Sequence, residues 1–335
     1  MKMSLADILS ARRAIATTVV RTPLLPSRCL SEAIDASFHL KMETMQPTGA
    51  FKLRGATNAA RNAPDGTTTL TCCSTGNHGR GVAYAARQLG LKAVICMSSI
   101  VPQTKIDGIR ALGAEVRISG TSQDDAAAAC RTLAQEPGIF EISPFDDPLV
   151  IAGQGTIGLE ILEDLPNLHT LLIPLSGGGL AAGVALAAKT INTRIRVIGV
   201  SMDRGAAMQA SLAAGRPVEV AEVPSLADSL GGGIGLENRL SFELCRDLLD
   251  DVVLVSEEEI YRAMQALFYQ DSHIAEGASV VGIAAVLAGK VKNLSGPLAT
   301  ILSGRNVDMH QVAKVVSGQD VQLGDYVVKG APYGA

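Results

Sequence analysis

The amino-acid sequence predicts an α/β protein built on parallel β-sheets. Short apolar segments alternate with Ala-rich helical segments along nearly the whole chain of 335 residues. Most of the apolar segments are continuous rather than alternating, as expected for strands that are buried on both faces. The residues are 47% hydrophobic but only 3% aromatic, with no Trp, so the apolar mass is aliphatic. This composition is typical of helices layered on sheets.

The predicted strands are separated by segments long enough to hold a helix, as parallel strands require. In chain order these strands are Phe38–Met42, Thr69–Cys73, Ala93–Met97, Glu115–Ile118, Thr170–Leu175, Arg196–Val200, Asp251–Val255 and Leu298–Leu302. The predicted helices are Gly79–Leu89, Gln103–Leu112, Thr121–Gln135, Leu180–Lys189, Glu257–Tyr269 and Ser279–Lys290. One helix start is explicit, because Ser256 precedes three glutamates and can cap the helix while Glu259 bonds back.

Composition and charge exclude several classes of protein. The chain is long enough for two domains. A net charge of −4 gives no basic surface for nucleic acid, and no segment reaches the length of a membrane span. Residues Met1–Ile8 lack the apolar core of a signal peptide. Six scattered cysteines without a C-x-x-C pair, among them adjacent Cys72 and Cys73, indicate buried thiols in a reducing cytoplasm rather than metal or redox chemistry.

The first candidate for chemistry is Lys52, in the turn Pro47-Thr48-Gly49-Ala50-Phe51-Lys52-Leu53-Arg54-Gly55. A lysine that forms a Schiff base must lose its proton before it attacks, so it belongs in a sheltered site. The aromatic ring of Phe51 is next to it in sequence. Alone, this pattern also fits a surface Lys-x-Arg at the start of a helix.

Two glycine-rich turns follow predicted strands and open helices. In Ser74-Thr75-Gly76-Asn77-His78-Gly79-Arg80-Gly81, backbone N–H groups can converge on a carboxylate or phosphate, and Asn77 can bond a ring hydroxyl. A plain capped turn is the alternative. In Ser176-Gly177-Gly178-Gly179-Leu180, each glycine costs roughly 1 kcal/mol in chain entropy, which indicates close approach of backbone to an anion. Neither turn is a nucleotide P-loop, and Asp203 is a poor ribose partner for a dinucleotide site.

The last signal is Ser303, followed by Gly304 at the end of the final predicted strand. A hydroxyl that faces a pyridine nitrogen leaves the ring neutral, which favours β-elimination over transamination. A strand-end capping serine is the alternative. An amine for a Schiff base, a phosphate cradle and a hydroxyl for a heterocycle nitrogen together predict pyridoxal 5′-phosphate (PLP) as cofactor.

The order of these motifs resembles the serine/threonine dehydratase family of fold-type II PLP enzymes, which includes threonine dehydratases and serine racemase. The matching segments are Thr48–Gly55, Ser74–His78, Ile151–Ile157, Ser176–Leu180, Glu276–Ala278 and Leu302–Gly304. They span nearly the whole chain in family order.

The resemblance implies a tryptophan synthase β-like fold, with two parallel-sheet α/β domains and the cofactor in the cleft between them. The small domain is expected at residues 69–136, inserted in a large PLP-binding domain formed by residues 1–68 and 137–335. Members of the family are usually homodimers or homotetramers, so an oligomer is expected here.

The resemblance also implies roles for the site residues. Lys52 would form the Schiff base and take the proton from Cα, and Phe51 would pack on the ring. Asn77 would bond the ring 3-hydroxyl, and Ser303 would face the ring nitrogen. The phosphate would bind to Ser176, Gly177, Gly178, Gly179 and Leu180, and the substrate carboxylate to Ser74, Thr75, Gly76, Asn77 and His78. Glu276 would lie on the pyridine side, or be a solvated glutamate at a helix start.

Three positions depart from the family pattern. Thr75 stands where threonine dehydratases carry Ala and serine racemase carries a catalytic Ser, so it is a candidate acid–base group. Ser201 and Ala207 stand where serine racemase has acidic metal ligands, so no metal is expected. Arg305 follows Gly304 and could read an additional carboxylate or acetyl group, or be a surface arginine.

The implied activity is dehydration and deamination of a hydroxy amino acid to a 2-oxo acid and ammonia. The Ser303–Asp308 and Ser74–Gly81 segments are similar to the hydroxyectoine utilisation dehydratase branch, so the substrate is threonine, serine or a hydroxyectoine derivative. An amino-acid racemase, with Thr75 acting opposite Lys52, and a non-catalytic ligand-binding protein on the same fold are the alternatives. A dinucleotide oxidoreductase would leave Lys52 and Ser303 unexplained.

Overall fold

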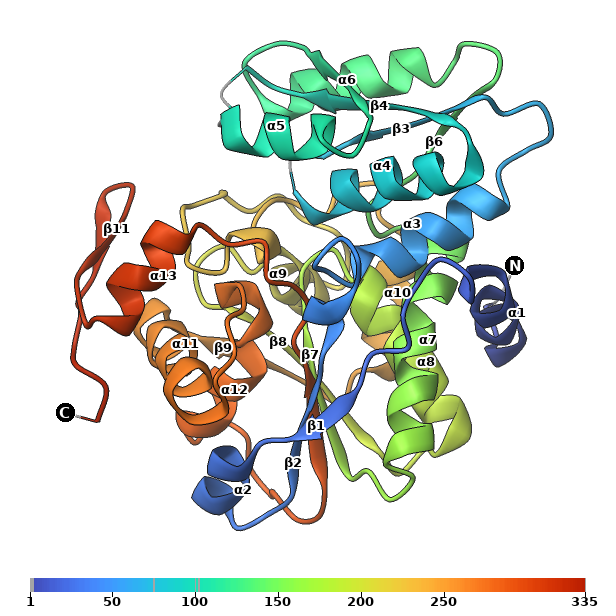
Figure 1. Ribbon diagram of the computed structural model, residues 1–335. Coiled ribbons are helices and arrows are strands. Elements are labelled where there is room, and N and C mark those ends of the chain that lie inside the picture. Colours follow the sequence, from blue (N-terminus) through green and yellow to red (C-terminus); the bar gives the residue numbers. More distant parts are fainter. Residues whose placement is uncertain (1–2, 75, 100, 102, 335) are drawn as a thin grey trace.

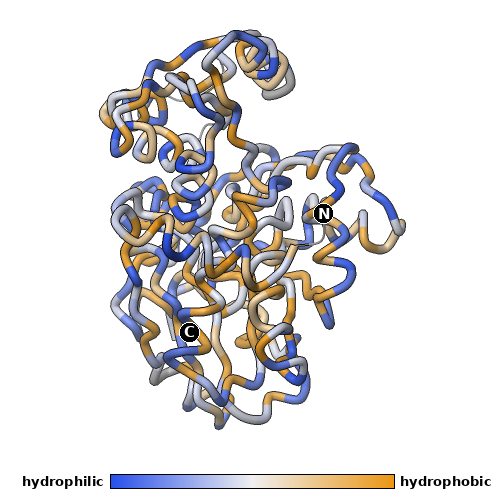
Figure 2. The backbone as a smooth tube through the Cα atoms, turned by 90° about the vertical axis from the view of Figure 1, so that its right-hand side faces the viewer, coloured by the Kyte–Doolittle hydropathy of each residue, from blue (hydrophilic) through white to orange (hydrophobic). Residues whose placement is uncertain are grey.

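Two separate parallel sheets form the framework of the protein, as the sequence predicts. The computed structural model describes residues 3–74, 76–99, 101 and 103–334, so Thr75 lies outside the described residues. Figure 1 shows the smaller sheet with its helices at the top and the larger sheet below. In Figure 2, segments of hydrophobic residues run through the interior of the lower part of the molecule.

The larger sheet has six strands in the order β1-β2-β10-β7-β8-β9. Their bounds are Leu24–Pro26 (β1), Phe38–Lys41 (β2), Thr170–Pro174 (β7), Arg196–Met202 (β8), Asp251–Val255 (β9) and Leu298–Ile301 (β10). All neighbours are parallel except β1, which runs antiparallel to β2. Every residue of β7 and β10 is buried, which explains why both strands consist mostly of apolar residues.

The smaller sheet has four parallel strands in the order β5-β4-β3-β6. They are Thr69–Cys73 (β3), Lys92–Met97 (β4), Glu115–Ile118 (β5) and Ile139–Glu141 (β6). Strand β6 lies beyond residue 136, where we placed the end of the inserted domain, yet it pairs with β3. The division of the chain into domains stays a prediction.

Helices connect the strands and cover the sheets. They are Leu5–Ile15 (α1), Arg28–Ile34 (α2), Lys52–Arg61 (α3), Asn77–Leu89 (α4), Gln103–Arg110 (α5), Gln123–Leu133 (α6), Pro148–Asp164 (α7), Gly179–Ile191 (α8), Ala207–Ala214 (α9), Leu240–Leu248 (α10), Glu257–Asp271 (α11), Val281–Leu287 (α12) and Met309–Val316 (α13). Short 3₁₀ helices occupy Glu43–Met45 (η1), Asp228–Leu230 (η2) and Gly277–Ser279 (η3), and a hairpin joins Val321–Leu323 (β11) to Tyr326–Val328 (β12).

The predicted elements are present with shifted ends. Helix α12 is shorter than the predicted Ser279–Lys290, because Ser279 belongs to the separate 3₁₀ turn η3. The expected cap of α11 is confirmed, since the Ser256 side chain accepts the Glu259 N–H and Glu259 bonds back to the Ser256 N–H. Helix α7 was not predicted, because the helix is buried on all of its faces and its apolar residues leave no clear helical period.

Helix α3 lies where the two sheets meet and packs against both α4 and α7. The crossing with α4 is close because Gly81 has no side chain, and a Cβ there would lie 3.2 Å from the backbone of Lys52. The first residue of α3 is Lys52. The position of α3 therefore decides where the Lys52 amine can reach.

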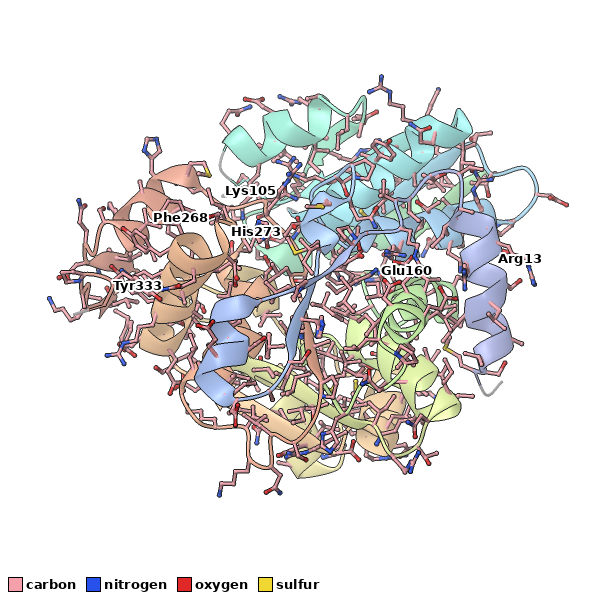
Figure 3. All side chains as sticks on the ribbon, turned by 60° about the horizontal axis from the view of Figure 1, so that its bottom comes forward. Arg13, Lys105, Glu160, Phe268, His273 and Tyr333 are labelled. Carbon is pink, nitrogen blue, oxygen red and sulfur yellow. The ribbon has the colours of Figure 1, made fainter. Side chains whose placement is uncertain are left out.

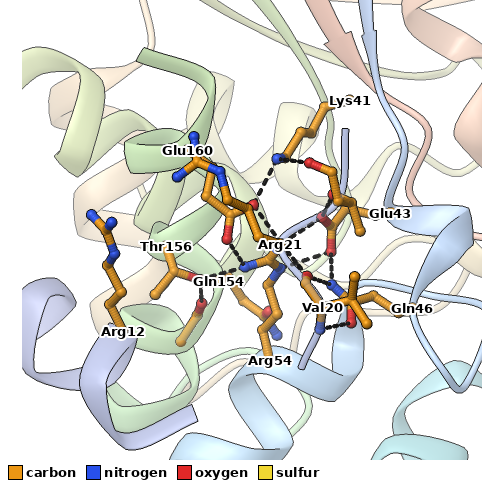
Figure 4. A network of polar contacts seen from close by, with 12 residues as sticks. Arg12, Val20, Arg21, Lys41, Glu43, Gln46, Arg54, Gln154, Thr156 and Glu160 are labelled. Carbon is orange, nitrogen blue, oxygen red and sulfur yellow. Dashed lines mark hydrogen bonds and ion pairs between the residues drawn. The ribbon is translucent and has the colours of Figure 1, made fainter. Parts of the chain in front are cut away.

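A buried network of ion pairs anchors α3 (Figure 4). Arg54 is completely buried, and its Nε and Nη2 each lie 2.8 Å from an oxygen of Glu43. Its Nη1 and Nη2 lie 2.7 and 2.8 Å from Glu160 on α7, which also accepts from Lys41 at 2.6 Å. Burial alone would raise the pKa of Glu43, but the charge and hydrogen bonds of Arg54 lower it. The network therefore keeps Glu43 ionised.

Loss of the Arg54 guanidinium should destabilise the whole fold, because it leaves two buried carboxylates without their strongest partner. We expect Arg54→Ala to lower the free energy of unfolding by about 3–5 kcal/mol in urea denaturation followed by circular dichroism. Arg21→Ala is the matched control, since Arg21 pairs with Glu163 and Asp164 at the surface. It should cost about 0–1 kcal/mol. Equal losses in the two variants would contradict this account.

Candidate active site

Lys52 has the environment of a reactive amine. Its side chain is half-buried, and Nζ donates to the Pro144 carbonyl oxygen at 2.6 Å. Nζ also lies 5.4 Å from the centre of the Phe51 ring. Burial lowers the pKa of Lys52 to about 8, with a smaller opposing effect from Cys72. About a tenth of this amine is therefore uncharged at pH 7, far more than for an ordinary lysine, and a Schiff-base lysine needs this uncharged form.

The loop from Ser74 to His78 opens α4 beside Lys52. The Ser74 hydroxyl accepts the Gly76 N–H at 3.3 Å, and Asn77 is the first helical residue. His78 is buried, and its Nε2 lies 2.8 Å from the Ile142 carbonyl oxygen. The Nε2 side of the imidazole is therefore engaged inside the protein. Binding of the substrate carboxylate by the loop from Ser74 to His78 stays a prediction.

The protonation state of His78 is fixed by its surroundings. Burial, with the nearby charge of Lys52, lowers the pKa of His78 to about 3, although the hydrogen bond to Ile142 opposes this. The ring is therefore neutral at physiological pH and donates from Nε2. Within the described part of the chain, its buried Nδ1 has no hydrogen-bond partner.

Glu276 is the centre of a buried cluster, so the alternative of a solvated glutamate is wrong. It is 3% exposed, and its Oε1 accepts from Asn77 Nδ2 and from the Asn306 N–H, both at 2.9 Å. Its Oε2 accepts from the Ser229 hydroxyl. Burial raises the pKa of Glu276, and these hydrogen bonds counteract part of the effect.

Asn77 is engaged at both ends of its amide. Besides donating to Glu276, it accepts from Asn306 Nδ2 at 2.6 Å. Sequence reasoning missed Ser229 and Asn306, which lie far from Asn77 in the chain. Asn306 is part of the Ser303–Asp308 segment that drew attention to this region, so a signal for it existed.

The glycine-rich turn follows β7 and opens α8. Gly178 has φ +91°, which a side chain would strain. The Gly177 carbonyl accepts from the Ser241 hydroxyl at 2.8 Å, which fixes the turn. A Cβ on Gly177 would lie 2.3 Å from the Phe145 ring, so one reason for this glycine is the packing of Phe145. The backbone N–H groups at the start of α8, from Gly179 and Leu180 on, suit an anion.

Ser303 lies at the end of β10, tied to the lysine loop. Its carbonyl accepts the Phe51 N–H at 2.9 Å, and Gly304 forms a bridge with Ala50. The Ser303 side chain is 6% exposed, and its Oγ lies 3.0 Å from Oγ of Ser279. The chain thus brings Lys52, Ser303, Glu276 and Asn77 into one region.

These residues fit PLP. Lys52 supplies a desolvated amine, the α8 turn supplies N–H groups for a phosphate, and Ser303 supplies a buried hydroxyl for a heterocycle nitrogen. Ser176 is half-buried at the same turn. When bound, PLP supplies an electron sink for charge at the substrate Cα.

Comparison with known proteins shows the family to which the chain belongs. The family model of pyridoxal-phosphate dependent enzymes matches residues 15–304, and the chain belongs to this family. A putative threonine dehydratase of Sinorhizobium fredii is 52% identical over 94% of this chain and 96% of that protein. An L-threonine ammonia-lyase of Thermotoga maritima is 40% identical over 96% of this chain and 80% of that protein.

Solved structures lead to the same class. Threonine deaminase isoform 2 from Solanum lycopersicum is 36% identical with a TM-score of 0.85, covering 93% of this chain and 92% of that one. Maize serine racemase is 31% identical with a TM-score of 0.88, covering 94% and 97%. The predictions of a serine/threonine dehydratase-like fold-type II enzyme, of PLP as cofactor and of a PLP-dependent ammonia-lyase are confirmed.

Two further observations bear on the remaining predictions. No helix in the described residues is long and apolar enough to cross a membrane. Within the same residues, no three His, Cys, Asp or Glu side chains gather as a metal site would require. The expectation that no metal binds near Ser201 and Ala207 stays a prediction. The cytoplasmic location and the oligomeric state also stay predictions.

The depressed pKa of His78 should make the protein less stable in acid. Between pH 6.5 and about 3, His78 is protonated in the unfolded chain but not in the folded protein. The free energy of unfolding therefore falls as the pH falls through this range. His78→Gln keeps a donor for Ile142 and cannot titrate. We expect the stability of wild type relative to His78→Gln to drop by about 1.4 kcal/mol per pH unit from pH 6 to 4. Urea unfolding at a series of pH values measures it, and parallel curves would contradict it.

Proposed function

We propose that the protein catalyses PLP-dependent β-elimination of a hydroxy amino acid, yielding a 2-oxo acid and ammonia. The observation that carries this proposal is the desolvated amine of Lys52 in the same region as the buried hydroxyl of Ser303. The first supplies a base and the second favours a neutral ring nitrogen. The names of the dehydratase and ammonia-lyase relatives support it.

In this proposal each residue has a definite task. Lys52 holds the cofactor and takes the proton from the substrate Cα. Phe51 packs on the cofactor ring, and Asn77, once released from Glu276 and Asn306, donates to the ring hydroxyl. The turn from Ser176 to Leu180 binds the phosphate.

The substrate side of the site is proposed at the start of α4. The substrate carboxylate is proposed to bind to the loop of Ser74, Thr75, Gly76, Asn77 and His78, at the N-terminal end of α4. Glu276 is proposed to lie on the pyridine side, and it holds the Asn77 amide only until the cofactor binds. Thr75, outside the described residues, is the proposed acid–base group on the second face.

The substrate itself is proposed to be threonine, serine or a ring-opened hydroxyectoine derivative. Each offers a hydroxyl β to the carbon that bears nitrogen and carboxylate, so the chemistry is the same while the side chain grows. A cytoplasmic homodimer or homotetramer is the proposed state. Likeness to maize serine racemase keeps amino-acid racemisation as the second candidate.

The test is release of 2-oxo acid and ammonia from the PLP-loaded protein, with L-threonine and hydroxyectoine in parallel. We expect turnover in at least one reaction, lowered roughly 10²–10⁴-fold or more in Lys52→Ala because the base is lost. Run in deuterated water, the assay also detects racemisation, which labels Cα of recovered substrate of both hands. Label without 2-oxo acid would favour the racemase, and binding without either reaction would favour a ligand-binding protein.

Arg305 should discriminate between these substrates. The backbone N–H of Arg305 donates to the Gly49 carbonyl oxygen at 2.9 Å, and the Arg305 side chain is exposed beside the lysine loop. We expect Arg305→Ala to lower kcat/KM about 10–100-fold for a substrate with a distal carboxylate or acetyl group, because a charge-assisted hydrogen bond is lost. Activity on L-threonine should change less than about 3-fold.

Two controls sharpen this measurement. Arg305→Lys keeps the charge but loses the planar fork, so it should recover only part of the discrimination. Arg13→Ala, an exposed arginine of α1 (Figure 3), should leave both substrates unaffected. Equal losses on both substrates in Arg305→Ala would assign Arg305 to the surface.

A further inference from the structure

The buried hydroxyl of Ser279 has two possible acceptors for its one proton. Ser279 is completely buried, and its Oγ lies 2.7 Å from the Gly304 nitrogen, 2.7 Å from the Gly304 carbonyl oxygen and 3.0 Å from Oγ of Ser303. A hydroxyl has one proton and two acceptor positions. The Gly304 N–H must donate to Ser279, so the Ser279 proton goes either to the Gly304 carbonyl or to Ser303.

These two choices have opposite consequences for Ser303. If Ser279 donates to the Gly304 carbonyl, Ser303 must donate to Ser279, and only lone pairs of Ser303 remain for a ligand. If Ser279 donates to Ser303, the proton of Ser303 becomes free for a ligand. A neutral pyridine nitrogen is an acceptor, so it requires the second arrangement.

The second arrangement leaves no backbone group without a partner. The Gly304 carbonyl also accepts the Glu276 N–H at 3.0 Å, so it stays bonded when Ser279 turns away. The Gly304 N–H still donates to Ser279. One hydrogen bond is exchanged for another by rotation of two hydroxyls, and the 2.7 Å contact between Ser279 Oγ and the Gly304 carbonyl oxygen then lengthens because no proton lies between them.

The geometry points to Ser279 as a positioning residue that sets the direction of the Ser303 proton. With PLP bound, Ser279 donates to Ser303 and Ser303 donates to the ring nitrogen, so the ring is held unprotonated. A donor that itself accepts a hydrogen bond is polarised and binds its acceptor more strongly. This inference rests on the proposed placement of Ser303 at the ring nitrogen.

The ring nitrogen itself can report the test. Protein loaded with PLP that carries nitrogen-15 in the ring gives a resonance that separates protonated, hydrogen-bonded and free pyridine nitrogen. We expect Ser303→Ala to move this resonance toward that of free neutral pyridine, and Ser279→Ala to move it the same way by a smaller amount. The dissociation constant of PLP should rise about five-fold in Ser279→Ala.

Further variants separate positioning from structure. Ser279→Thr keeps the hydroxyl and should restore the wild-type resonance. Thr300→Val removes another buried hydroxyl of β10, bonded to the Leu172 carbonyl, and should leave the resonance unchanged. Should Ser279→Ala lose its fold or its cofactor, Ser279→Cys carries the same test, because a thiol is a weak donor.

Each outcome has one meaning. A resonance that moves in Ser303→Ala but not in Ser279→Ala overturns the role of Ser279 and leaves Ser303 in place. A resonance that moves in neither variant means that Ser303 does not face the ring nitrogen, so the proposed placement fails with the inference. Movement in Ser279→Ala without recovery in Ser279→Thr assigns Ser279 to the structure of the Gly304 turn and overturns its role.

Discussion

The buried ion pairs of Arg54 are the constraint on which the site depends. One guanidinium joins α3 to η1 through Glu43 and to α7 through Glu160. Lys52, the first residue of α3, lies two residues before Arg54 in the sequence. Because the planar fork of arginine holds both carboxylates at fixed angles, helix α3 can neither slide nor rotate without leaving a buried charge unpaired. The position of the reactive amine is thus set by electrostatics in the core.

A second constraint closes the site from the other end of the chain. The segment after β10 passes over the lysine loop, where Ser303 accepts from Phe51 and Gly304 pairs with Ala50. A Cβ at position 304 would lie 2.4 Å from Glu276 Oε1, so a larger residue there would displace the Glu276 carboxylate. Residues from the two ends of the sequence therefore share one rigid unit, to which α4 adds Asn77.

The sequence predicted much of this arrangement and missed definite parts. Buried parallel strands carry continuous apolar runs and the loops carry glycine, so β3, β7, β10 and the turns after them were predictable. Arg54 was not, since one reading of Lys-x-Arg was a surface pair, and only the distant Glu43 and Glu160 make it a core residue. The roles of Ser279, Ser229 and Asn306 were not predicted for the same reason, because an isolated polar residue acquires a role only through partners that the fold supplies.

The two buried acids Glu43 and Glu276 have pKa values that shift in opposite directions, and this difference separates a structural role from a functional one. Glu43 lies against the cation of Arg54, which lowers its pKa and keeps it charged. Glu276 is also buried. Among the described residues its hydrogen bonds come from Asn77, Ser229 and the Asn306 backbone, which are all neutral donors. Its pKa is raised instead. A buried carboxyl that neutral groups hold can change protonation when a charged ligand arrives, whereas an acid locked to a guanidinium cannot. The core therefore combines a fixed charge network, which positions Lys52, with an adjustable acid on the side where Asn77 and Ser303 would meet the cofactor.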